Sequence, residues 1–148
     1  MEQVKLTIDR SDLFDSSCQI VDIPVSDLQT KRLTINFKGE EAVGLDWVKR
    51  DFMQTISTVV MNPECGLFIR TENKKKNEHT LNPDCLSLLG GDKKPIQLIG
   101  RLMAICIIYR CTLGRRLSKL FFKALFQVKM NLDDFKEEVN FLLAQPEL

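Results

Sequence analysis

Two cysteines and the only histidine of the chain lie within one short stretch, and together they could bind a metal ion. The motif Asn-Pro-acid-Cys occurs twice, ending at Cys65 and at Cys85, and His79 lies between the two copies. Thiolate and imidazole groups are usual zinc ligands, but structural sites hold two ligands close together in sequence. Cys65 has no such neighbour, and a fourth ligand is missing. We therefore expect no metal site here, and we interpret the stretch as a hairpin between two turns.

The remaining cysteines raise the question of a thiol nucleophile. A catalytic cysteine usually needs a base beside it, and nothing in the sequence brings His79 to a cysteine. Cys106 lies in an apolar segment, Cys18 has acidic neighbours, and Cys111 is the most plausible thiolate because two arginines are near it in sequence. No phosphate-binding glycine motif is present in the sequence. We expect no catalytic residue, no cofactor and no cofactor-binding residue.

Composition and charge limit the class of protein. The chain has 148 residues, which is enough for one domain with its own core. A net charge of +1 gives no electrostatic reason to expect nucleic acid or a membrane surface as partner. The apolar run at Leu102–Tyr109 is far shorter than the roughly 20 residues that span a bilayer. Five cysteines, an odd number, and a start without a secretory signal favour a reducing compartment, the cytoplasm or the nucleus.

The first half of the chain predicts a strand, a helix and a hairpin. Residues 32–38 alternate apolar and polar side chains, which is typical of a strand with one buried face. Apolar residues from Leu45 to Val60 recur at helical spacing, and Asn62 with Pro63 ends that helix. Residues 66–71 and 78–81 have strand composition, and they can pair across a tip that carries Lys74–Lys76.

The second half predicts three helices. The first runs from Pro95 to about Cys111, and Gly114 separates it from a second helix with a basic face and an apolar stripe. Such a helix can bind membranes or calmodulin, but we expect its stripe to pack on the core. A third helix is predicted over residues 132–145, and the fold class is α+β, mostly helical, with a small hairpin or sheet. The basic residues are Arg115, Arg116, Lys119 and Lys123; the stripe comprises Leu113, Leu117, Leu120, Phe121, Ala124, Leu125 and Val128.

Six short motifs, taken in order, carry a resemblance to a known family. They are KLTIDRSDLFDSS, LTINFKGEEA, NPECGLF, LNPDCLSL, LIGRLMAICI and LSKLFFKALF. In sequence and spacing they resemble the amino-terminal lobe of HECT-type ubiquitin ligases, over nearly the whole chain. The matching residues are Arg10, Leu13, Phe37, Gly39, Glu40, Asn62, Pro63, Gly66, Leu67, Phe68, Asn82, Pro83, Asp84, Leu86, Ile99, Gly100, Arg101, Leu102, Ala104, Phe121 and Lys123.

The chain also departs from the family pattern. Cys65 replaces a tyrosine, Cys85 replaces a histidine, Leu120 replaces a proline and Phe122 replaces a tyrosine. A glycine pair of the family is missing from residues 42–52, and residues 88–97 resemble an insertion. The resemblance therefore identifies a divergent member of the family.

The resemblance implies a function that the residues alone do not. Residues 1–148 would be a single domain, the larger part of a HECT amino-terminal lobe, and the two Asn-Pro elements would bracket its hairpin. Complete HECT domains continue with a subdomain that docks the ubiquitin-conjugating enzyme and a lobe that carries the catalytic cysteine. We therefore expect a scaffold of a ubiquitin ligase, inactive alone, whose partners through the full-length protein are the conjugating enzyme, ubiquitin and protein substrates. The alternative is an inactive HECT-like interaction module.

Overall fold

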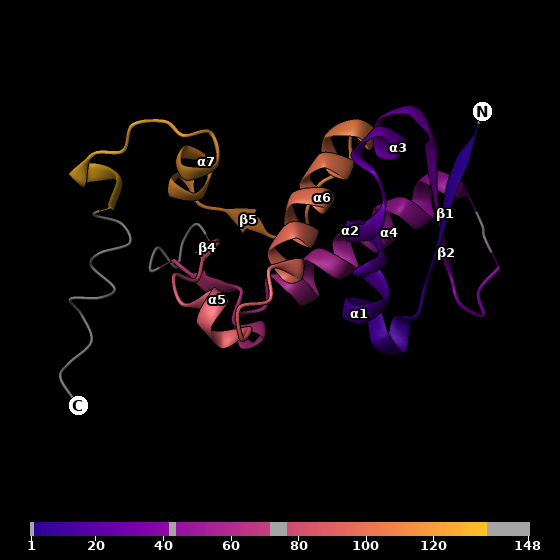
Figure 1. Cartoon of the computed structure of the whole chain (residues 1–148), viewed down its shortest axis with the longest axis horizontal. Helices are drawn as coiled ribbons and strands as arrows, with labels where there is room; N and C mark the ends of the chain where they lie inside the picture. Colours follow the sequence, from indigo (N-terminus) through magenta and orange to yellow (C-terminus); the bar gives the residue numbers. More distant parts are fainter. Residues whose placement is uncertain (1, 42–43, 72–76, 136–148) are drawn as a thin grey trace.

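The computed structural model describes residues 2–41, 44–71 and 77–135, and Figure 1 shows how their elements are arranged. The long helix α6 (Lys94–Tyr109) stands in the middle of the molecule. On one side of it lie the first strands and helices, up to α4 (Leu45–Val60). On the other side lie a small three-stranded sheet and the short helix α7 (Lys119–Leu125). This arrangement is mostly helical α+β, which confirms the predicted fold class.

The first sheet consists of two parallel strands, β1 (Gln3–Ile8) and β2 (Arg32–Phe37). The strand predicted over residues 32–38 is thus confirmed as β2, whereas β1 was not predicted. Parallel strands need a long crossover, and here the short helices α1 (Leu13–Ser17), α2 (Gln19–Asp22) and α3 (Val25–Thr30) form it. The apolar side chains Leu6, Ile8, Leu33, Ile35 and Phe37 of these strands are buried, which favours the observed pairing register from Gln3–Arg32 to Ile8–Phe37.

Helices α4 and α6 each contribute several buried apolar side chains to the core. Both predicted helices are confirmed, with bounds within two residues of those expected. Helix α6 ends at Tyr109, and the left-handed backbone of the next residue, Arg110, lets the Cys111 N–H donate to the Cys106 carbonyl at 3.0 Å. The fully buried core side chains of these two helices include Phe52, Met53, Ile56, Leu98, Leu102 and Ile105.

The predicted hairpin is also confirmed. Strand β3 (Phe68–Arg70) pairs antiparallel with β4 (Glu78–Leu81), and the predicted tip with Lys74–Lys76 lies outside the described residues. Strand β5 (Arg116–Leu117) pairs parallel with β4 and makes the sheet three-stranded, which the sequence did not predict.

The two Asn-Pro elements make matching turns at the base of this hairpin. Asn62 begins the 3-10 turn η2 (Pro63–Cys65) by accepting a hydrogen bond from the Glu64 N–H. Asn82 accepts one from the Asp84 N–H in the same way, before the short helix α5 (Cys85–Leu88). Its amide nitrogen also donates to the Gly66 carbonyl at 2.9 Å. The repeated motif therefore has an architectural use, because each asparagine caps a turn and Asn82 is also hydrogen-bonded to Gly66 at the end of the first turn.

The helix predicted after Gly114 is much shorter than expected. Leu113 and Leu117 do not belong to it, because the chain stays extended until Ser118, which caps α7 by accepting from the Phe121 N–H. Tertiary contacts prevent the helix from starting earlier. Gly114 donates to the Ser57 hydroxyl at 2.6 Å, and a Cβ at this position would lie 2.8 Å from the Gln54 carbonyl oxygen. Contact with α4 and pairing with β4 thus override the helical periodicity.

The prediction that the stripe of this region packs on the core is confirmed for one part of it only. Leu113, Leu117 and Phe121 pack half-buried against the core, whereas Ala124, Leu125 and Val128 are exposed. These side chains border a groove, because α7 stands off from α6 instead of packing tightly on it.

The last predicted helix begins where expected. Residues 132–135 form one helical turn, and the rest of the predicted range lies outside the described residues. None of the helices described in residues 2–41, 44–71 and 77–135 combines the length and apolar character needed to cross a membrane.

Candidate functional site

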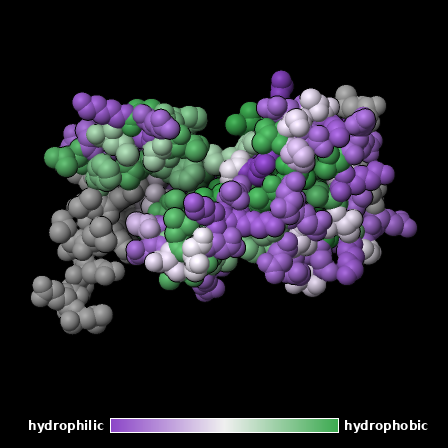
Figure 2. Space-filling model, in the orientation of Figure 1, coloured by the Kyte–Doolittle hydropathy of each residue, from purple (hydrophilic) through white to green (hydrophobic). Residues whose placement is uncertain are grey.

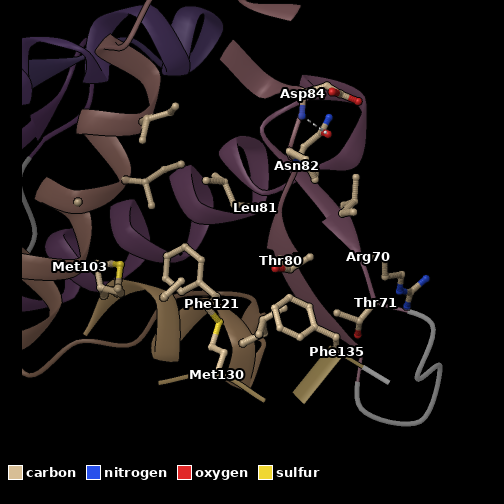
Figure 3. Close-up of a pocket in the computed structure, with 18 residues that line it drawn as sticks. Arg70, Thr71, Thr80, Leu81, Asn82, Asp84, Met103, Phe121, Met130 and Phe135 are labelled. Carbon is tan, nitrogen blue, oxygen red and sulfur yellow. Dashed lines mark hydrogen bonds between the residues drawn. The ribbon is translucent and has the colours of Figure 1, made fainter. Parts of the chain in front are cut away.

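A groove of about 770 Å³ lies between α6 and α7. We call it the α6–α7 groove. Its floor and walls come from α6, the β3–β4 hairpin, α7 and the segment that follows α7. Figure 3 shows the labelled side chains of Met103, Phe121, Met130 and Phe135 around one common space. The apolar side chains that line the groove are Ile69, Leu81, Ile96, Ile99, Met103, Leu120, Phe121, Leu125, Met130 and Phe135.

The side chains that line the groove indicate what kind of group it can bind. Phe121 packs against the fully buried Phe68 with ring centroids 6.1 Å apart, which couples the groove wall to the core. The polar groups Arg70, Asn82 and Asp84 lie at its hairpin end, and Asn82 and Asp84 are engaged in their own turn. An apolar cleft with a few polar groups at one end binds apolar side chains, and no pair of reactive groups is arranged there for catalysis.

An exposed apolar surface continues from the groove over α7. Phe122 and Phe126 stack with ring centroids 6.4 Å apart, although Phe126 is 70% exposed. Leu125, Val128 and Met130 are also exposed, and Figure 2 shows the apolar residues gathered over this part of the molecule. A contiguous apolar surface of this kind usually marks an interaction site.

The chain after α7 is held at the groove by polar contacts. Asp134 accepts from the Lys123 ammonium at 2.7 and 2.8 Å, and its side chain is only 7% exposed. The Asp134 N–H donates to the Asn131 side chain, and the Asn131 N–H donates to the Asp134 carboxylate. This reciprocal pair is a capping box that starts a helix. The pKa of Asp134 is lowered, chiefly because Lys123 donates to its carboxylate.

The three residues considered as zinc ligands have separate structural roles. Cys65 lies exposed in η2, Cys85 is buried at the start of α5, and His79 is buried in β4. Burial lowers the pKa of His79, against the opposing effect of a hydrogen bond with the Arg116 backbone. Within the described part of the chain, no three side chains of His, Cys, Asp or Glu group closely enough to hold a metal ion.

The absence of bound zinc remains a prediction that a measurement must test. Protein purified without chelator should contain well below one zinc per chain by elemental analysis, because no chelating pair of close ligands is present. Stoichiometric zinc that disappears in Cys65→Ser, but not in a Cys18→Ser control, would contradict the structural assignment of the hairpin.

The remaining thiols are poorly suited to be nucleophiles. Burial and, to a smaller extent, the nearby Cys111 raise the pKa of Cys106 to about 11, in agreement with the expected apolar helix. Burial also raises the pKa of Cys65 and Cys18, with smaller contributions from Glu64 and Asp15. Cys111 is half-buried just after α6, and its thiol lies 3.6 Å from the Tyr109 carbonyl oxygen.

Residues of separate motifs meet in the structure. The Arg10 guanidinium bonds to the Glu40 carboxylate and, at 2.6 Å, to Asp51, and it lies 3.5 Å from the centroid of the Phe37 ring. The sequence motif KLTIDRSDLFDSS, which contains Arg10, is thereby bound to the end of β2 and to α4. Sequence reasoning had paired none of these residues and had not found the groove. The signal for the groove was present in α6, which is apolar on more than one face.

Comparison with known proteins supports the family resemblance of the sequence motifs. Residues 54–143 match the family model described as HECT-domain (ubiquitin-transferase). The chain is 26% identical over 140 residues to E3 ubiquitin-protein ligase Smurf1 of Drosophila melanogaster. This alignment covers 89% of the chain and 12% of the relative. It is 27% identical over 136 residues to the human E3 ubiquitin-protein ligase HECW2, covering 90% of this chain and 8% of the relative.

A third relative is the E3 ubiquitin-protein ligase hecw-1 of Caenorhabditis elegans. It is 30% identical over 132 residues, which cover 88% of this chain and 10% of the relative. The chain thus spans only about a tenth of the length of these relatives. The family match covers more than half of the chain, and it falls on the elements that build the hairpin, α6 and α7. The chain therefore belongs to the HECT-domain family.

Proposed function

We propose that residues 1–148 form one domain, the larger part of the amino-terminal lobe of a HECT-type ubiquitin ligase. The main support for this proposal is the match of residues 54–143 to the HECT-domain family model. The motif residues support it, since they build turns, a buried ring contact and an ion-pair cluster instead of a reactive site. Their role would be to hold other parts of the ligase in place.

The proposed mechanism is positioning. In a HECT ligase, ubiquitin passes from the thioester on the conjugating enzyme's cysteine to a cysteine of the ligase, so the distance between the two sulfurs governs the rate. A rigid lobe reduces the entropic cost of bringing them together. The partners through the full-length protein would be the conjugating enzyme, ubiquitin and substrate proteins. Five free cysteines are consistent with a reducing compartment, the cytoplasm or the nucleus.

A thioester assay tests the proposal. Full-length protein is mixed with activating enzyme, a panel of conjugating enzymes, ubiquitin and ATP, and gels are run with and without reductant. The full-length protein should form a reductant-sensitive ubiquitin adduct. If it forms none with any conjugating enzyme, the ligase proposal fails and an inactive interaction module replaces it.

The isolated 148-residue chain should form no such adduct. Its most reactive candidate, Cys111, is half-buried, and the pKa values of Cys106, Cys65 and Cys18 are raised. The same assay with Cys111→Ser provides the control. A reductant-sensitive band at the mass of the chain plus one ubiquitin, lost in Cys111→Ser, would show that the chain is itself an acceptor of ubiquitin.

A further inference from the structure

Two of the free cysteines, Cys106 and Cys111, occupy the two positions of a helix end whose side chains commonly meet. Helix α6 ends in a Schellman motif: Arg110 has left-handed backbone angles (φ 52°, ψ 41°), and the Cys111 N–H donates to the Cys106 carbonyl at 3.0 Å. In this motif the side chains of the two residues joined by that hydrogen bond often pack together. Both cysteines are half-buried, and both pack against the core.

The backbone brings the two residues within the range of a disulfide bond. Such a bond needs Cα atoms about 4.4–6.8 Å apart. Residues joined by backbone hydrogen bonds usually meet this condition, as they do in antiparallel strands at about 5.5 Å. The electrostatics agree with a short distance, because Cys111 adds to the larger effect of burial in raising the pKa of the Cys106 thiol.

Contacts on both sides of Cys111 hold this arrangement in place. Tyr109 lies inside the loop that a disulfide would close, and its hydroxyl accepts a hydrogen bond from the Leu33 N–H at 2.7 Å. After Cys111, the Gly114 N–H donates to the Ser57 hydroxyl at 2.6 Å. The two thiols therefore have little freedom to move apart, and a reaction between them gains from this preorganisation.

We propose that Cys106 and Cys111 form a redox-sensitive modification site, in which a peroxide drives the formation of an intrachain disulfide across the end of α6. The Cys111 thiolate attacks hydrogen peroxide, the O–O bond breaks, and the hydroxide that leaves takes up a proton and becomes water. Cys111 is then a sulfenic acid. The Cys106 sulfur attacks it, the S–S bond forms, and the S–O bond breaks to release a second water with the Cys106 proton. Two thiols are thus oxidised to one disulfide, and one hydrogen peroxide is reduced to two waters.

The order of the two steps follows from the surroundings of the sulfurs. The thiolate is the form that attacks a peroxide, and burial, with a smaller effect of Cys111, raises the pKa of Cys106 to about 11. Cys106 therefore stays a thiol, and Cys111 reacts first. Disulfides in reducing compartments are usually transient and serve redox sensing, so cellular thiols would reverse this bond. The proposal does not depend on ligase activity.

Peptide mapping of the full chain tests this proposal. Folded protein is treated with equimolar hydrogen peroxide, the remaining thiols are blocked with N-ethylmaleimide, and the denatured protein is digested with trypsin without reductant. Cleavage after Arg101, Arg110 and Arg115 separates the two cysteines, so the disulfide should link peptide 102–110 to peptide 111–115. This pair should be the main disulfide species and should disappear on addition of reductant. The measurement needs no substitution, so it does not depend on the folding of a variant.

Serine variants test the order of the two steps. In Cys106→Ser the sulfenic acid has no partner thiol, so dimedone should trap it on Cys111. In Cys111→Ser, dimedone should label Cys106 far less at the same peroxide concentration. Cys18→Ser is the matched control, because Cys18 is also a half-buried free thiol. This variant should keep the linked peptide pair as in the parent.

Several results would overturn the proposal. It fails if the folded parent keeps both thiols in the form that N-ethylmaleimide labels, or if its main disulfide joins other cysteines. It also fails if the linked peptides come from two molecules, which a mixture of isotope-labelled and unlabelled chains reveals. Dimedone adducts on Cys106 in preference to Cys111 would overturn the order assigned to the two sulfurs.

Discussion

Replacing Phe68 with alanine should lower the free energy of unfolding by about 3–5 kcal/mol, enough to unfold a domain of ordinary stability. Phe68 is fully buried in β3, and its ring packs on that of Phe121 in α7. Its removal would leave a cavity in the core, and it would remove the ring against which Phe121 of α7 packs. Urea unfolding followed by circular dichroism measures the effect.

Phe126→Ala is the matched control for this prediction. Phe126 has the same side chain but is 70% exposed just after α7. Its truncation should change the free energy of unfolding by no more than about 0.5 kcal/mol. If Phe68→Ala unfolds at the same urea concentration as Phe126→Ala, the hairpin is not part of the cooperative core.

Replacing Tyr109 with alanine should have an effect of similar size, about 3–5 kcal/mol, for a different reason. The Tyr109 hydroxyl accepts a hydrogen bond from the Leu33 N–H at 2.7 Å, which joins the end of α6 to strand β2. The Lys49 ammonium lies 4.0 Å from the centroid of the Tyr109 ring, and the Lys49 side chain is only 4% exposed. The alanine variant would leave the Leu33 N–H without its acceptor and would remove the aromatic ring from the buried Lys49 ammonium, which would keep its ion pair with Asp46 at 3.5 Å.

Tyr109→Phe separates the two contributions. It keeps the ring over Lys49 and removes only the hydroxyl, so it should cost about 1–3 kcal/mol, the penalty for an unsatisfied buried donor. Thermal and urea unfolding of both variants measure the difference. Equal losses in Tyr109→Phe and Tyr109→Ala would show that the ring and its cation contribute nothing.

Local patterns were enough to predict the elements whose partners are close in sequence. Helix α4 follows from its apolar spacing and from the Asn62-Pro63 stop, and β3 with β4 follows from two short strands around a polar tip. The family resemblance added what the residues did not show, namely the kind of lobe to which these elements belong. It rested on motif order, and the comparisons confirm the family.

The errors arose where distant contacts decide the local structure. Strand β1 was missed although Val4, Leu6 and Ile8 alternate with polar residues, because its partner lies a whole crossover away. The helix after Gly114 was predicted too long, because apolar spacing gives no information on the hydrogen bond from Gly114 to Ser57 or on the pairing of β5 with β4. The groove was missed for the same reason, since it exists only where α7 stands off from α6.

Helix α6 presents apolar side chains to the core on one side and to the groove on the other, and this links the groove to the stability of the whole molecule. Leu98, Leu102 and Ile105 are fixed in the core, while Ile96 and Met103 of the same helix face the groove. Whatever binds the folded groove, and not the unfolded chain, adds its binding free energy to that of folding. The melting temperature of this domain should therefore report whether the groove is occupied, and a ligand that binds there should raise the melting temperature of the core as well as that of the groove wall.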